Sequence, residues 1–154
     1  MKIKSLTFLL LATSTLMCIG QTDLKSIDKS VQDIKINLPA FKKVEKINSK
    51  DGSRFVFLQG NELKLITVQS LEPTIEKNVE WYFIDGQLAY CETNWVDTKT
   101  KTTIFSDTYY LHNGHLIFWA NSRDNTIDPS SDRFKKTEAE LVAYGVKIKE
   151  EALK

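Results

Sequence analysis

The sequence predicts an α+β protein, in which an antiparallel β-meander of about six strands lies between an N-terminal amphipathic helix and a C-terminal helix. Apolar residues recur at helical spacing near both ends of the region that follows residue 20. Between them, β-rich segments are separated by two-residue turn sequences. These segments also resemble one another, and a repeat of hairpins builds a meander.

The first twenty residues have the order of a signal peptide. Lys2 and Lys4 precede a short apolar run, and the small-residue site before Gln21 predicts cleavage after Gly20. The run is too short for a membrane span, which needs roughly 20 apolar residues. We therefore expect a periplasmic or secreted protein with a signal peptide at 1–20 and a single hairpin-meander domain at 21–154. Acylation of Cys18 is the alternative route of export, although Met17 stands where lipoprotein motifs have a small residue.

The charge of the chain excludes some classes of partner, and its cysteine content excludes an internal disulfide. Removing Lys2 and Lys4 with the signal peptide leaves 19 of the 21 basic residues against 20 acidic ones. A chain so close to neutral has no electrostatic footprint for nucleic acid or anionic lipid. Of the 2 cysteines, only Cys91 follows the signal peptide, so an internal disulfide is excluded and a buried thiol is expected.

Two segments have the periodicity of amphipathic helices. The first is followed by Pro39, which ends it, and its apolar stripe consists of Leu24, Ile27, Val31, Ile34 and Leu38. The second follows a polar loop at 121–131, and its apolar residues are Phe134, Leu141, Tyr144, Ile148 and Ala152. Gly145 inside it costs about 1 kcal/mol relative to Ala, which indicates a bend or a close contact there.

Three hairpins are predicted by turn dipeptides between β-rich runs. Their turns are Gly60-Asn61, Asp85-Gly86 and Asn113-Gly114, sequences that supply the positive φ of two-residue turns. The flanking strands are expected at 54–58 and 63–69, at 79–84 and 87–95, and at 104–112 and 115–120. The lysines around Phe41 are interpreted as a solvated strand or helix face.

The turns fix an expected register. Phe83 should face Leu88 and Trp81 should face Tyr90, while Leu111 faces Leu116 and Tyr109 faces Phe118. One core face would then carry Val79, Trp81, Phe83, Leu88 and Tyr90. The reverse face would carry Tyr82, Ile84, Ala89, Cys91, Tyr110, Ile117 and Trp119, and the terminal helices should cover part of it.

The hairpins share the pattern aromatic-Phe-x-x-Gly-x-Leu, which is seen in Trp81 to Leu88, in a variant at Tyr109 to Leu116 and in a fainter copy at Phe57 to Leu63. In this pattern they resemble small exported proteins of unknown function in Gram-negative bacteria. The Tyr-x-x-Gly-x-Leu form is also similar to MORN-type hairpin repeats, which serve as protein- or lipid-binding arrays. The copies here are spaced more widely and less regularly than in that family.

Catalytic and metal-binding signatures are scarce. The sequence contains no phosphate-binding glycine loop, no G-x-S-x-G, no H-E-x-x-H and no paired C-x-x-C, so neither catalytic residues nor a cofactor are predicted. His112 and His115 flank the Asn113-Gly114 turn and could share a metal. A zinc site needs a third ligand that the sequence does not place, so exposed turn residues are favoured.

A ligand pocket is predicted on the aromatic face. Glu92 and Asp107 lie beyond Tyr90 and Tyr109 in the expected register, so these four and Trp81 could hold a sugar-like or cationic ligand. We therefore expect a non-catalytic binding module for a small ligand or a protein. A small hydrolase-like enzyme using Glu92 and Asp107 is one alternative, and a lipid-anchored structural envelope protein is the other. Trp95 and Trp119, both expected on the reverse face, either form an exposed aromatic patch or lie under a helix.

Overall fold

The computed structural model describes residues 23–49 and 52–154. The expected signal peptide, its cleavage after Gly20 and the alternative acylation of Cys18 therefore lie outside the described residues. Within the described part of the chain, no helix is long and apolar enough to cross a bilayer.

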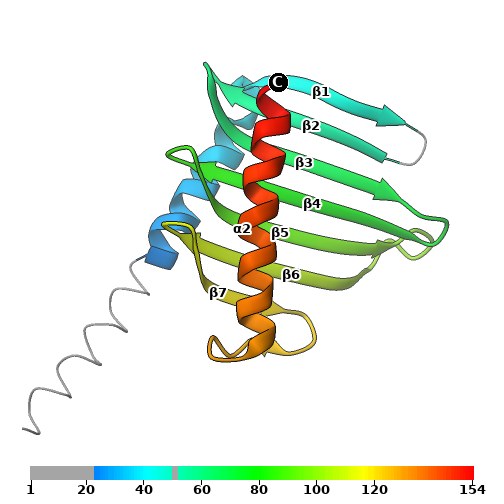
Figure 1. The fold of residues 1–154 in the computed structure, drawn as a ribbon. Coiled ribbons are helices and arrows are strands. Elements are labelled where there is room, and N and C mark those ends of the chain that lie inside the picture. The colour runs from blue at the N-terminus through cyan, green and yellow to red at the C-terminus, as the bar shows by residue number, and fades with distance from the viewer. Residues whose placement is uncertain (1–22, 50–51) are drawn as a thin grey trace, which may run out of the picture.

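The centre of the molecule is an eight-stranded antiparallel sheet whose strands follow one another in chain order from β1 to β8 (Figure 1). The fold is thus an antiparallel meander with an N-terminal and a C-terminal helix, as the sequence predicts. The strands are β1 (Lys42–Ser49), β2 (Gly52–Gln59), β3 (Glu62–Leu71), β4 (Ile75–Ile84), β5 (Gln87–Asp97), β6 (Thr103–His112), β7 (His115–Asn121) and β8 (Asn125–Thr126).

The prediction of six strands was wrong, and the two additional strands are the edges of the sheet. β1 is rich in lysine and contains a bulge between Glu45 and Ile47, features that blunt an edge strand against pairing with another chain. The same features hide its β pattern in the sequence. β8 lies inside the segment 121–131, which the sequence predicts to be loop. It is only two residues long and pairs with Ala120 and Asn121 of β7.

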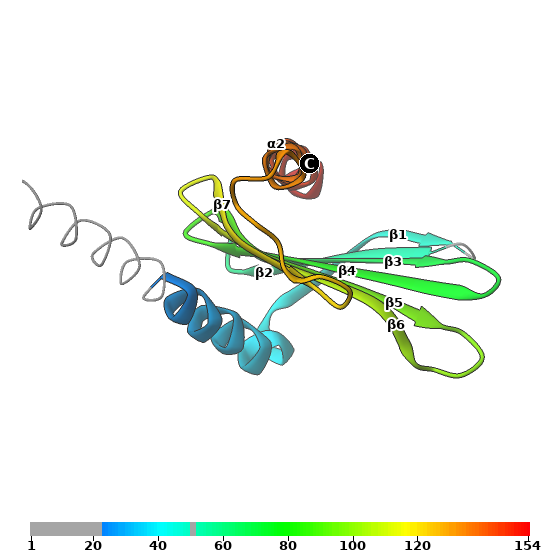
Figure 2. The ribbon, with the colours of Figure 1, turned by 90° about the horizontal axis from the view of Figure 1, so that it is seen from below.

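The two helices cover opposite faces of the sheet (Figure 2). The N-terminal helix spans residues 23–37 and continues into a 3-10 turn, η1 (Leu38–Ala40), which contains Pro39. It buries Ile27, Val31 and Ile34, so the predicted apolar stripe is confirmed. The C-terminal helix, α2 (Asp132–Leu153), begins where the Ser131 hydroxyl accepts a hydrogen bond from the Phe134 backbone N–H. We call the two sides of the sheet the α2 face and the N-helix face.

The predicted two-residue turns are present. Asp85 and Gly86 both have positive φ, at 51° and 73°, and Asn113 and Gly114 have φ of 51° and 77°. Positive φ at both central positions is the conformation of a type I′ turn, which Asp-Gly and Asn-Gly favour. The turns give the expected pairing of Phe83 with Leu88 and of Leu111 with Leu116.

The register beyond each turn differs from the prediction, because the second strand of each hairpin contains a bulge. In β5, Phe83 pairs with Leu88 but Tyr82 pairs with Tyr90, so Ala89 is an extra residue. One extra residue exchanges the faces of all later positions. Tyr90 and Phe118 therefore lie on the N-helix face, whereas Cys91 and Trp119 lie on the α2 face with Trp81. The equivalent extra residues are Lys64 in β3 and Ile117 in β7.

Both faces of the sheet contribute to the core. On the α2 face there are two buried clusters. Ile148 and Ala152 of the helix pack on the first, whose sheet residues are Val56, Leu63, Ile66, Trp81, Phe83 and Cys91. Phe134 of the helix packs on the second, whose sheet residues are Leu111, Leu116 and Trp119. On the N-helix face, the buried sheet residues are Phe57, Leu65, Tyr82 and Tyr90. The helices therefore cover one face each, whereas the sequence placed both over the reverse face.

Gly145 is a point of close approach between α2 and the sheet. A Cβ atom at this position would lie 2.7 Å from Cδ2 of Leu88, which is closer than van der Waals contact allows. The close contact expected from a glycine inside a helix is therefore present. The contact lets α2 pack directly on Leu88 of β5.

The thiol of Cys91 lies in the centre of the sheet beneath α2 and is 1% exposed. Burial, with a further contribution from the nearby Asp107, raises the pKa of this thiol. The thiol is therefore both inaccessible to reagents and held in its unreactive protonated form. For a chain that begins at Gln21, we expect no reaction of the folded protein with Ellman's reagent over hours, and reaction of one thiol per chain in urea. Rapid labelling without denaturant would contradict the burial described here.

Candidate functional site

The five residues predicted to line a pocket are divided between the two faces of the sheet. Trp81, Asp107 and Tyr109 lie on the α2 face, whereas Tyr90 and Glu92 lie on the N-helix face. Asp107 pairs with Thr93, and the next position, Glu92, pairs with Thr108. Because consecutive residues point to opposite faces, Glu92 and Asp107 cannot act together. The predicted carboxylate pair was wrong, and the bulge at Ala89 is the reason.

Glu92 belongs to a polar network on the N-helix face. It lies directly across from Glu80 in the neighbouring strand. Its carboxylate accepts hydrogen bonds from Asn94 at 3.0 Å and from the Tyr90 hydroxyl at 3.4 Å, and Nζ of Lys35 lies 3.7 Å away. Lys35 comes from the N-terminal helix, so this carboxylate links helix and sheet.

Asp107 has a structural role beneath the aromatic residues of the α2 face. It is buried, and its carboxyl oxygen accepts a hydrogen bond from Nε1 of Trp119 at 2.8 Å. Burial and the adjacent Asp107 raise the pKa of Tyr109, so the phenol remains protonated as a hydrogen-bond donor. Asp107 therefore holds two aromatic side chains in place.

A pocket of about 480 Å³ lies between α2 and the sheet, and we call it the Trp81 pocket. Trp81 and Tyr109 line it, so the structure brings these two predicted residues together. Its remaining lining comes from β3, β4 and α2: Val68, Val79, Thr137, Glu140, Leu141 and Tyr144. The α2 residues could not be assigned to it from the sequence, because no local pattern shows where a C-terminal helix crosses a sheet.

Tyr144 and Trp81 form the aromatic part of this pocket. Their ring centroids are 5.0 Å apart and their planes are inclined by 37°. Tyr144 is 40% exposed although it belongs to the predicted apolar stripe of the helix. The pair therefore presents one buried and one accessible ring, with the Glu140 carboxylate one helical turn before Tyr144.

The two remaining tryptophans have different environments. Trp119 is buried under α2, where its ring lies 6.5 Å from that of Phe134, so the expectation of a tryptophan under a helix is met there. Trp95 is half-buried and packs on Phe105 at 5.2 Å, with the Lys77 ammonium 4.9 Å above its ring. Both lie on the α2 face and not on the reverse face predicted for them.

His112 and His115 pair with each other across the end of the β6–β7 hairpin. Nδ1 of His115 lies 3.0 Å from Glu138 of α2, a neighbour that the sequence did not reveal. Within residues 23–49 and 52–154, no group of three or more His, Cys, Asp or Glu side chains is arranged to hold a metal ion.

The fold and the pocket together define a two-faced meander with an aromatic pocket beside its C-terminal helix. Comparison with protein-family models, with curated proteins and with solved structures finds no match to this chain. The site must therefore be interpreted from its own geometry.

Proposed function

We propose that this protein is an exported, non-catalytic binding module that holds a small, ring-bearing ligand in the Trp81 pocket. The observation that carries the proposal is the tilted pair of Trp81 and Tyr144 at a pocket of about 480 Å³. That volume is within the range of small-molecule sites, and stacked aromatic side chains bind the flat faces of rings.

The polar groups of the pocket favour a neutral or cationic ligand. Glu140 brings a carboxylate to its rim, Thr137 and Tyr109 bring hydroxyl groups, and none of the residues that line it is basic. A cation over an aromatic face, next to a carboxylate, is stabilised by both groups. An anion would be repelled by this carboxylate, which the exposed Lys136 ammonium 3.9 Å away only partly offsets.

The separation of Glu92 and Asp107 supports binding over catalysis, because the hydrolase alternative required these two carboxyl groups on one face. Export rests on the basic, apolar and small-residue segments of residues 1–20. Acylation of Cys18 would instead anchor the same domain to a membrane, and mass spectrometry of the mature N-terminus distinguishes the two forms.

Titration of the purified protein with three probes tests the proposal. The probes are benzyltrimethylammonium, the neutral disaccharide cellobiose and the anion benzenesulfonate, followed by tryptophan fluorescence and by NMR shifts of the Trp81 indole N–H. We expect saturable shifts with the ammonium or the disaccharide, and none with benzenesulfonate. Tyr144→Ala should weaken the binding about tenfold, since it removes the accessible ring.

Val146→Ala is the matched control, because Val146 is an exposed residue of the same helix that does not line the Trp81 pocket. It should bind like the wild type. The proposal is overturned if neither the ammonium nor the disaccharide saturates, or if Tyr144→Ala binds as well as the wild type while its circular dichroism shows an intact fold.

A further inference from the structure

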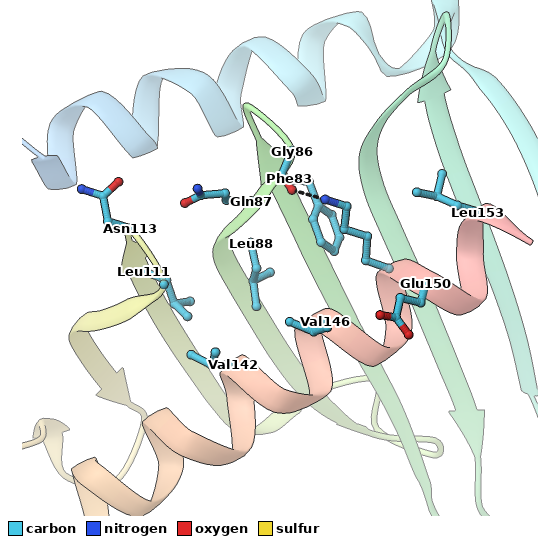
Figure 3. Close-up of a pocket in the computed structure, with 13 residues that line it drawn as sticks. Phe83, Gly86, Gln87, Leu88, Leu111, Asn113, Val142, Val146, Glu150 and Leu153 are labelled. Atoms are coloured by element: carbon cyan, nitrogen blue, oxygen red, sulfur yellow. Dashed lines mark hydrogen bonds between the residues drawn. The ribbon is translucent and has the colours of Figure 1, made fainter.

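A second pocket, of about 420 Å³, lies between α2 and the tips of the β4–β5 and β6–β7 hairpins (Figure 3). We call it the Lys149 pocket. None of its lining residues is shared with the Trp81 pocket. It is therefore a separate site, which can bind a ligand whether or not the Trp81 pocket does.

The interior of the Lys149 pocket is mostly apolar. Leu88 and Leu111 point into it from the sheet, and Val142 and Val146 point into it from the helix (Figure 3). Val146 and Leu153 at its margin are 56% and 53% exposed. An apolar ligand that covers these side chains removes their surface from water, which contributes favourably to the free energy of binding.

One cation lies in this aliphatic surrounding. Nζ of Lys149, which is half-buried, donates a hydrogen bond to the backbone carbonyl of Gly86 at the β4–β5 turn (Figure 3). Glu150 also lines the pocket. Even so, no carboxylate in the described part of the chain comes within ion-pair distance of the Lys149 ammonium. An ammonium has three donors, so the carbonyl orients the group and leaves two donors for a ligand.

We infer that the Lys149 pocket binds a free aliphatic carboxylate, with its chain between Leu88, Leu111 and Val146 and its head group on Lys149. The aliphatic lining selects an alkyl chain, since each methylene removed from water contributes favourably to binding. The unpaired ammonium selects an anionic head, because charge-assisted hydrogen bonds are stronger than neutral ones.

Calorimetric titration of the purified protein with decanoate, decanol and decyltrimethylammonium tests this inference. We expect decanoate to bind about tenfold more tightly than decanol and the cation to bind more weakly than either. Lys149→Met keeps the length of the side chain but removes its charge, so it should reduce decanoate affinity to that of decanol. Val146→Asp should weaken both ligands, because it places a carboxylate among the aliphatic side chains.

Two control variants show whether decanoate binding depends on this pocket alone. Lys147→Met removes an exposed charge from the same helix and should leave decanoate binding unchanged, as should Tyr144→Ala in the other pocket. Equal decanoate affinity in Lys149→Met and the wild type overturns the inference. A second result would also overturn it: the protein sediments with phosphatidylglycerol vesicles but does not bind decanoate. The anionic acyl ligand would then be a membrane lipid and not a free carboxylate.

Discussion

Replacement of Asp107 by alanine is expected to lower the free energy of unfolding by about 2–3 kcal/mol. Nε1 of Trp119 donates to this carboxyl group inside the core, and a buried donor without an acceptor costs about 1–3 kcal/mol. The change also opens a small cavity beneath Tyr109, which adds to the loss. Urea unfolding followed by tryptophan fluorescence measures the difference.

Asp107→Asn is the matched variant, since an amide oxygen can still accept the Trp119 hydrogen bond. We expect it to stay within about 1 kcal/mol of the wild type. In a Trp119→Phe background, where the indole donor is absent, Asp107→Ala should cost less than it does in the wild type. If the Asn and Ala variants lose the same stability, the charge of Asp107 and not its acceptor atom supports the core.

The turns of this fold could be predicted from the sequence because their chemistry is local. Asp85-Gly86 and Asn113-Gly114 adopt positive φ at both positions, and few residue types do so without strain. The same holds for the N-terminal helix, whose apolar spacing matches the residues it buries. Such features depend on a few consecutive residues and not on their partners.

The bulges could not be predicted, and they account for the errors at the candidate site. Ala89 and Ile117 occupy the extra positions, and neither is a residue type that marks a bulge in sequence. Their effect is nevertheless large, because each exchanges the faces of all residues that follow. Tyr90 and Glu92 moved away from Trp81 for this reason, while Tyr109 kept its place beside it.

The parts of the site that come from α2 depend on packing across the whole chain. Gly145 packs on Leu88, 57 positions away in sequence, and the neighbouring Tyr144 packs on Trp81. From the sequence, a glycine inside a helix indicates a close contact, but the strand that Gly145 contacts cannot be identified. Gly145 and Leu88 both line the Lys149 pocket, so the position of that pocket is visible only in the folded structure.

The stability of the folded protein is expected to fall steeply above pH 10. Burial is the largest cause of raised pKa values at Tyr82, Tyr90, Tyr109 and Tyr110, and each phenol also has a carboxylate neighbour. The Tyr82 hydroxyl donates to Glu80 at 2.5 Å and the Tyr110 hydroxyl to Asp28 at 2.6 Å. The folded state thus keeps these protons, whereas tyrosines of the unfolded chain release them near pH 10.

Because the pKa values are raised in the folded state, the stabilisation is complete below pH 10 and is lost as the pH rises above it. A fully buried tyrosine contributes up to about 1.4 kcal/mol per pH unit; Tyr82 and Tyr90, at 1% and 8% exposure, should approach this limit. The more exposed Tyr109 and Tyr110 contribute less because solvent screens them. The buried thiol of Cys91 also lowers the stability as the pH rises, starting at about pH 8.5, where thiols of the unfolded chain ionise.

Urea midpoints measured at pH 8, 10 and 11 test this dependence, with phenolate absorbance at 295 nm recorded for the folded and unfolded protein. Tyr82→Phe removes one of the retained protons, so it should reduce the slope between pH 10 and 11 by about one proton. Below pH 9 the same variant should show a constant offset from the lost hydrogen bond to Glu80. If Tyr82→Phe leaves the slope of stability against pH unchanged, Tyr82 ionises equally in the folded and unfolded states. That result would contradict its burial beneath the N-terminal helix.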